Sequence, residues 1–280
     1  MDKVTIKNEY AEFTAEFLGA RPSSLVAEGR EWLAGYISPI LFPVIGPLPD
    51  NEHIYEGKTY PMPMHGFAKD MEFEIAKKTD TSVELVLEAN DETRKMFPFE
   101  FRFVVNYSLD KNKLITSYTV ENIGNNKMCY GIGSHIGFNI TLPKDDYEIE
   151  FNADLENNKD LFVFGNDPEL RSYIPLNKGK MGVRTKFFEQ GAVIMGNHNA
   201  TSYKLTNRND NTLVIYNSSD YECMTVWSDV KSPFLCIEPW SYRSCHYERK
   251  KNMNEINGIS FLDSGKKKTY TYEIACELKK

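Results

Sequence analysis

The run FPFEFRFVVNY at residues 97–107 gives the strongest indication of the fold. One parity of this run is aromatic or apolar throughout, and the other parity is mostly polar: Phe97, Phe99, Phe101, Phe103, Val105 and Tyr107 alternate with Pro98, Glu100, Arg102, Val104 and Asn106. Successive side chains of a β-strand point to opposite faces of a sheet. We therefore predict a long strand over 97–107, in an antiparallel sheet that packs against a core on one face.

The same period of two recurs along the rest of the chain. It is seen at 13–17 and 83–87, and further strand-like runs occupy 114–120, 147–151, 212–216, 224–227, 234–238 and 268–274. Polar turn sequences separate these runs at 109–112, 122–125, 207–210 and 263–265. No amphipathic helix longer than about three turns is found. The pattern predicts an all-β fold, a large antiparallel β-sandwich or a barrel, and the lack of a linker predicts a single domain over residues 1–280.

Charge and hydropathy exclude several classes of partner. The 280 residues carry 33 Lys and Arg against 40 Asp and Glu, a net charge of −7, which argues against nucleic acid as a partner. The most apolar stretch, 39–48, is far shorter than the roughly 20 residues that a membrane span needs, and it contains three prolines. The N-terminus is polar from its second residue, so no secretory signal is expected and a cytoplasmic location is predicted.

The cysteines also favour a reducing compartment. Their number is odd and no C-x-x-C pair occurs, so we expect free thiols rather than disulfides or a zinc ribbon at Cys129, Cys223, Cys236, Cys245 and Cys276.

Three segments place a potential catalytic side chain beside glycine or proline, and each is a candidate for chemistry. They are PMPMHGFAKDMEFE at 61–74, GIGSHIGFN at 131–139 and FLCIEPW at 234–240, which contain His65, His135 and Glu238. Glu238 ends an apolar strand, where partial desolvation would raise its pKa and suit it to act as a base. The alternative is that Glu238 pairs with Arg243 at the surface and that both histidines are structural.

Other kinds of site receive less support from the spacing. A site with two histidines and one carboxylate for a metal lacks any H-x-H or H-E-x-x-H spacing, so no metal site is expected. There is no dinucleotide loop, phosphate loop or G-x-S-x-G nucleophile. Glycoside hydrolysis stays open, with Asp70 or Asp229 as the second carboxylate beside Glu238.

The three segments, in this order, resemble the aldose 1-epimerase (galactose mutarotase) family, most closely its shorter bacterial branch. The likeness spans most of the chain and is carried by SPILFP at 38–43, HGFAKD at 65–70, VEN at 120–122, GSH at 133–135, FN at 138–139 and CIEPW at 236–240. It implies a β-supersandwich of the galactose mutarotase type that interconverts the anomers of a free aldose, without cofactor or metal. The implied partner is a small-molecule sugar, and a monomer or homodimer is expected.

The resemblance also suggests roles for individual residues. Glu238 corresponds to the general base that takes the proton from the anomeric hydroxyl, and His135 to the general acid that protonates the ring oxygen. His65 corresponds to a second histidine that binds the sugar and polarises the ring oxygen. Further contacts to the sugar are expected from Lys69, Asp70, Asn139, Trp240 and Arg243. Trp32, Phe138 and Trp227 could also offer an aromatic face, but by default each is a core residue.

The chain departs from the family pattern around this trio. Pro47 follows Gly46 where the family has a sugar-contacting arginine, Lys69 replaces another arginine, and Gln190 stands where an acid is expected. The trio is thus present while much of the sugar-orienting shell has changed. Three alternatives therefore stay open. They are a non-catalytic carbohydrate-binding or sensing protein, a mutarotase of hexose phosphates that uses Lys69 and Arg243, and a lyase or glycosidase on the same sandwich.

Overall fold

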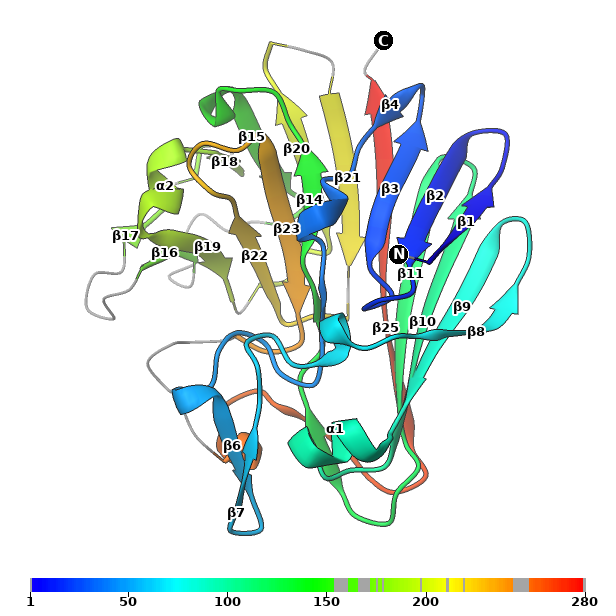
Figure 1. Ribbon diagram of the computed structural model, residues 1–280. Helices are drawn as coiled ribbons and strands as arrows, with labels where there is room; N and C mark the ends of the chain where they lie inside the picture. Colours follow the sequence, from blue (N-terminus) through cyan, green and yellow to red (C-terminus); the bar gives the residue numbers. More distant parts are fainter. Residues whose placement is uncertain are drawn as a thin grey trace.

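The computed structural model describes residues 2–153, 161–165, 172–174, 176–177, 179–196, 198–209, 212–218, 220–243 and 252–278. Two large antiparallel sheets dominate it (Figure 1). The predicted all-β class and antiparallel sandwich are confirmed. No helix in these ranges is long and apolar enough to cross a membrane.

The nine-stranded sheet has the order β18 (Lys180–Gly182), β15 (Tyr147–Phe151), β20 (Ser202–Asn207), β21 (Thr212–Ser218), β25 (Lys267–Leu278), β11 (Lys113–Asn122), β10 (Phe101–Asp110), β9 (Ser82–Glu88) and β8 (Glu74–Lys78). The second large sheet has the order β17 (Ser172–Tyr173), β16 (Leu161–Gly165), β19 (Gly191–Met195), β22 (Cys223–Trp227), β23 (Phe234–Trp240), β13 (Gly133–Ser134) and β5 (Ile40–Leu41), and β14 (Ile136–Asn139) also pairs with β23.

Three smaller sheets and several short helices complete the described fold. The small sheets are β1 (Lys3–Lys7), β2 (Ala11–Glu16), β3 (Pro22–Ala27) and β4 (Arg30–Glu31); β12 (Met128–Tyr130) with β24 (Ser260–Leu262); and β6 (Glu52–Tyr55) with β7 (Lys58–Pro61). The helices are α1 (Asp91–Met96), α2 (Thr185–Gln190) and the 3-10 turns η1 (Gly35–Ile37), η2 (Pro49–Asn51), η3 (Ala68–Asp70), η4 (Lys144–Asp146) and η5 (Met253–Glu255).

The strand predicted over 97–107 begins later, at Phe101. The side chain of Asn90 accepts hydrogen bonds from two backbone N–H groups of α1, so a helix occupies 91–96 instead. Pro98 then has no N–H to donate to a ladder. The predicted face is nevertheless correct, because Phe97 and Phe99 are buried together with the inward residues of β10. The other predicted strands lie within observed ones, except that Phe17 follows the end of β2. Asp210, in one of the predicted turns, lies outside the described residues.

The core between the two large sheets is rich in aromatic rings. Phe42, which follows β5, stacks on Phe103 of β10 with ring centroids 4.7 Å apart. The hydroxyls of Tyr118 and Tyr272, on β11 and β25, lie 3.0 Å apart, and both lie within 3.3 Å of the Ser134 hydroxyl on β13. The nine-stranded sheet is therefore hydrogen-bonded to the residue that precedes His135.

The cysteine prediction is confirmed where the structure describes the residues. Cys129, Cys223, Cys236 and Cys276 are free and buried, and Cys245 lies outside the described residues.

Candidate active site

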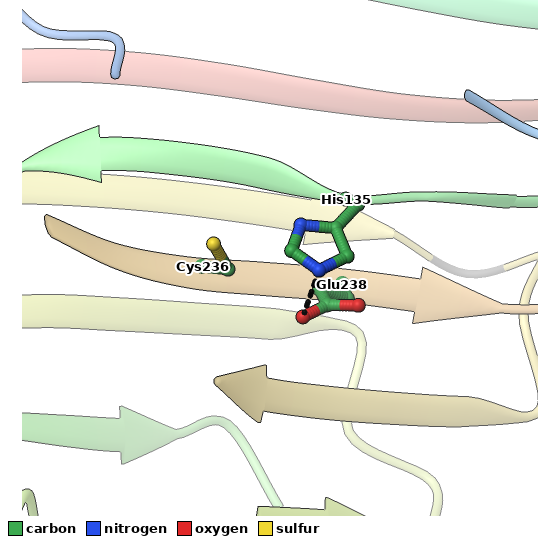
Figure 2. A group of neighbouring side chains, drawn as sticks. All are labelled: His135, Cys236 and Glu238. Carbon is green, nitrogen blue, oxygen red and sulfur yellow. Dashed lines mark ion pairs between the residues drawn. The ribbon is translucent and has the colours of Figure 1, made fainter. Parts of the chain in front are cut away.

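His135 and Glu238 face each other across two neighbouring strands of the second large sheet. The pairs Gly133↔Trp240 and Ile136↔Ile237 fix the register, which places His135 directly opposite Glu238. Their side chains meet on one face, with His135 Nε2 3.2 Å from Glu238 Oε1 (Figure 2). Residues 103 positions apart in the sequence are thus brought into contact by strand pairing.

The ring of His135 is held by the segment before β5. Nδ1 lies 3.1 Å from the carbonyl oxygen of Ile37, and a carbonyl can only accept, so Nδ1 carries a proton and donates it. The backbone N–H of His135 donates to the Pro39 carbonyl at 3.2 Å. These two bonds direct Nε2 toward Glu238, so Nε2 is the nitrogen that is available for proton transfer.

Burial sets the charge of the pair. Burial raises the pKa of Glu238 well above its usual range, and the indole N–H of Trp240 opposes the shift. Burial also lowers the pKa of His135 to about 4, against the opposing effect of its backbone hydrogen bonds. Both shifts disfavour charge, so burial favours the state in which a single proton lies between Oε1 and Nε2 and both side chains are neutral.

Unpartnered polar atoms surround this pair. Thr225 is directly opposite Glu238 on β22, and Trp240 is two residues further along the same face of β23. Among the described residues, Thr225 Oγ1 and Trp240 Nε1 are buried without a hydrogen-bond partner. Buried polar groups are normally hydrogen-bonded, so two such atoms beside the pair indicate a place that can bind a polar ligand.

His65 reaches the same place from a tightly constrained loop. The residue has φ +66°, and Gly66 beside it has φ +78°. A Cβ on Gly66 would lie 2.0 Å from the Phe42 carbonyl oxygen, so only glycine fits there. The N–H of Gly46 donates to His65 Nδ1 at 3.1 Å, which leaves the ring proton on Nε2. The His65 and His135 ring centroids are 5.9 Å apart.

The aromatic candidates divide into two groups. Trp32 and Phe138 are fully buried core residues. Trp227 is half-buried, and its ring centroid lies 5.5 Å from that of His135, so it forms one wall of the site.

Three of the expected sugar-binding residues have contacts of another kind. Lys69 forms an ion pair with Asp70, its own neighbour in the chain. Asn139 donates from its side chain to the carbonyls of Leu33 at 2.8 Å and Glu31 at 3.3 Å, which fastens β14 to that segment. Their contact with a sugar stays a prediction.

Arg243 lies beyond the end of β23. It lines a cavity of about 160 Å³ whose other described lining residues are Gly196, Glu222, Asn257 and Gly258. The idea of a surface Glu238–Arg243 pair is wrong, because Glu238 is 1% exposed and the partner of its carboxyl is His135. The side chain of Gln190, where the family pattern has an acid, lies outside the described residues.

Sequence reasoning missed Thr225 and the position of Cys236 beside the pair. Cys236 faces the same side of β23 as Glu238, two residues earlier (Figure 2). No sequence motif contains either residue. Their places beside the pair follow only from the pairing register of β22, β23 and β13.

The antiparallel sandwich places the protein in the class of galactose mutarotase-like proteins. The chain belongs to the aldose 1-epimerase family, whose members are isomerases, and the family's sequence profile matches residues 2–252.

Similar proteins agree with this assignment. A galactose mutarotase-related enzyme from Lactobacillus acidophilus has a TM-score of 0.88 and 26% identity, over 99% of this chain and 97% of its own. A galactose mutarotase-like protein from Lactobacillus casei has a TM-score of 0.88 and 27% identity, over 99% and 100% of the two chains. The plasmid form of protein LacX from Lactococcus lactis subsp. lactis is 26% identical over an alignment of 290 positions, which covers 94% of this chain and 97% of that protein.

Proposed function

We propose that the protein interconverts the α and β anomers of a free aldose by opening and reclosing the sugar ring, with Glu238 and His135 as the acid–base pair. The observation that carries the proposal is the buried Glu238–His135 pair with its 3.2 Å contact, beside the Thr225 hydroxyl and the Trp240 indole, which have no hydrogen-bond partner among the described residues. The family and the mutarotase-like relatives support the same reaction.

The geometry suits the two proton transfers of ring opening. The anomeric oxygen O1 and the ring oxygen O5 are bonded to the same carbon, so a base and an acid in mutual contact reach both at once. Sugar hydroxyls that hydrogen-bond to the Glu238 carboxyl, together with the Trp240 N–H, favour its ionised form. The shared proton then moves from Oε1 to His135 Nε2, which gives a carboxylate base and an imidazolium acid.

The reaction itself leaves the number of protons in the site unchanged. Glu238 takes the proton from the O1 hydroxyl, the C1–O5 bond breaks, and O5 takes the proton from His135 Nε2. The products are the open-chain aldehyde and the same uncharged pair that exists before binding. Rotation about C1–C2 and the reverse steps close the ring to the other anomer. His65, which carries its proton on Nε2, donates to a sugar oxygen and helps to polarise the ring.

A neutral aldose is favoured over a phosphorylated one by the charge around the pair. Of the two candidates for binding a phosphate, Lys69 has its ammonium paired with Asp70, and Arg243 lines a cavity that it shares with Glu222. Burial disfavours charge on the pair itself, so the patch around it offers hydrogen-bond partners rather than positive charge.

The test is anomer exchange, measured by polarimetry or by NMR, with a panel of aldoses and their 6-phosphates. We expect Glu238→Gln and His135→Gln each to slow exchange by about 10²–10⁴-fold. Glu84→Gln, on β9 of the other large sheet, is the matched control and should retain the rate.

Exchange that is indifferent to Glu238→Gln would refute the proposal. Sugar binding without any exchange would assign the protein to the non-catalytic carbohydrate-binding class. Faster exchange of a 6-phosphate than of its parent sugar would favour the hexose-phosphate alternative.

A further inference from the structure

Cys236 brings a third metal-binding atom to the Glu238–His135 pair. Its thiol lies on the same face of β23 as the carboxyl, and the ligand atoms of His135, Cys236 and Glu238 all lie within 4.8 Å of one another (Figure 2). We propose that these three side chains form a binding site for a zinc-like divalent metal ion, and that an ion bound there blocks the sugar site.

The donor set matches the chemistry of zinc. Zinc takes thiolate, imidazole and carboxylate ligands, whereas magnesium and calcium select shells of oxygen. Bonds of about 2.0–2.3 Å in a tetrahedral arrangement separate neighbouring donors by about 3.3–3.6 Å. The observed separation of His135 Nε2 and Glu238 Oε1 is 3.2 Å, so two of the donors are already spaced for a shared ion.

Charge and burial favour the ion once it is bound. A thiolate and a carboxylate carry two negative charges, which balance a divalent ion and leave a neutral complex in a buried place. Cys236 is 0% exposed and Glu238 is 1% exposed, so the complex is shielded from water on that side. Three protein ligands leave the fourth position of a tetrahedral ion open to water.

Neighbouring residues orient the proposed metal ligands and leave a path by which an ion can reach them. The bond from His135 Nδ1–H to the Ile37 carbonyl is the kind of outer contact that orients metal-bound histidines. The Thr225 hydroxyl, opposite Glu238 and unpartnered among the described residues, can donate to the ligating carboxylate. Ala34 and Phe234 pack over Cys236, whereas the His135 side chain is 13% exposed, so an ion enters past the imidazole.

An ion in this place and an aldose under conversion exclude each other. The ion would be bound by Glu238 Oε1 and His135 Nε2, and the proposed reaction needs these same two atoms to accept and donate its protons. The site therefore provides inhibition by zinc-like ions, in a reaction that needs no metal. This consequence rests on the proposed function, but the binding of the ion does not.

The test uses Co²⁺ as a spectroscopic probe on the full-length protein, without any sugar. Cobalt bound to a thiolate gives an intense charge-transfer band in the near ultraviolet, which imidazole and carboxylate ligands alone do not give. We expect the band in the native protein and its bleaching when Zn²⁺ is added. Cys236→Ser should abolish the band and weaken Zn²⁺ binding at least about 100-fold, since loss of an outer contact alone costs 10–100-fold. Cys276→Ser, a buried thiol on β25, is the matched control and should keep the band.

Two outcomes overturn the proposal: a native protein without the band, and a band that persists in Cys236→Ser. Circular dichroism checks the fold of each variant, and His135→Gln serves as a second ligand variant if Cys236→Ser does not fold. Unchanged cobalt affinity in His135→Gln would equally refute the site. Failure of the proposed epimerase reaction would appear only in anomer exchange, so the two proposals fail separately.

Discussion

Glu238→Gln removes the proposed base, yet we expect it to raise the free energy of unfolding relative to the native protein, by an amount that grows as pH rises. Burial keeps the native Glu238 carboxyl protonated above the pKa that it has in the unfolded chain. Between these two pKa values the native state binds one proton more than the unfolded state. The free energy of unfolding of the native protein then falls by about 1.4 kcal/mol for each pH unit. Glutamine keeps the shape of the side chain and does not titrate.

The window above pH 6.5 isolates this effect. His135, with its pKa lowered to about 4, is neutral there in the native state, and its titration in the unfolded state, near pH 6.5, is the same in both proteins. All other groups titrate alike in both proteins. The variant should therefore gain about 1.4 kcal/mol relative to the native protein for each pH unit, and the gain should stop where pH passes the raised pKa of Glu238.

Urea unfolding at several pH values, followed by circular dichroism, measures the difference. His135→Gln retains Glu238 and is the control, and its slope above pH 6.5 should equal that of the native protein. A constant difference between Glu238→Gln and the native protein would refute the reasoning, because it would mean that the native carboxyl is already ionised. The uncharged pair would then have to be replaced by an ion pair.

Three further predictions concern stability. Gly66→Ala should lower the free energy of unfolding by more than about 3 kcal/mol, because the new Cβ would lie 2.0 Å from the Phe42 carbonyl oxygen. Gly57→Ala is the comparison: Gly57 has φ +75° but no described atom lies within 4 Å of its Cβ position, so the loss should be only about 1–2 kcal/mol. Equal losses in urea unfolding would contradict this. Asn90→Ala should cost about 1 kcal/mol by removing the cap of α1, and an unchanged melting temperature would show that the cap is dispensable. Tyr272→Phe should cost about 1–3 kcal/mol, because two buried hydroxyls lose a partner, and calorimetry measures it.

The sequence predicts the sandwich well because strand alternation is a local signal. Each inward residue of β10 can be assigned from its neighbours alone. The start of that strand could not be predicted in the same way, because Phe97 and Phe99 keep the parity of the run although α1 and Pro98 displace the ladder. At Phe97 and Phe99 the alternation therefore indicates which side chains are buried, but not that the residues pair in a strand.

The candidate site could be predicted only in part, because its assembly depends on register. Glu238 and His135 stand out locally and through the family resemblance. Their contact follows from the pairing of β13 and β14 with β23, which no local pattern specifies. Thr225 lies in an ordinary strand sequence, and only its pairing with Glu238 identifies it as part of the candidate site. The partner of Lys69 depends on side-chain conformation, which residue type alone does not reveal.

The position of β25 has a consequence for how the protein is made. This strand is the last one along the described chain, yet it lies in the middle of its sheet, between β21 and β11. The strand groups on its two sides are linked to each other through it, over sequence separations such as the 154 residues between Ser117 and Thr271. A ribosome releases β11 long before β25, so the larger sheet cannot close until β25 has been synthesised. Until β25 is present, β11 and β21 each have one edge whose backbone groups are not paired. A chain that stops before residue 267 would leave these edges permanently open to pairing with other chains.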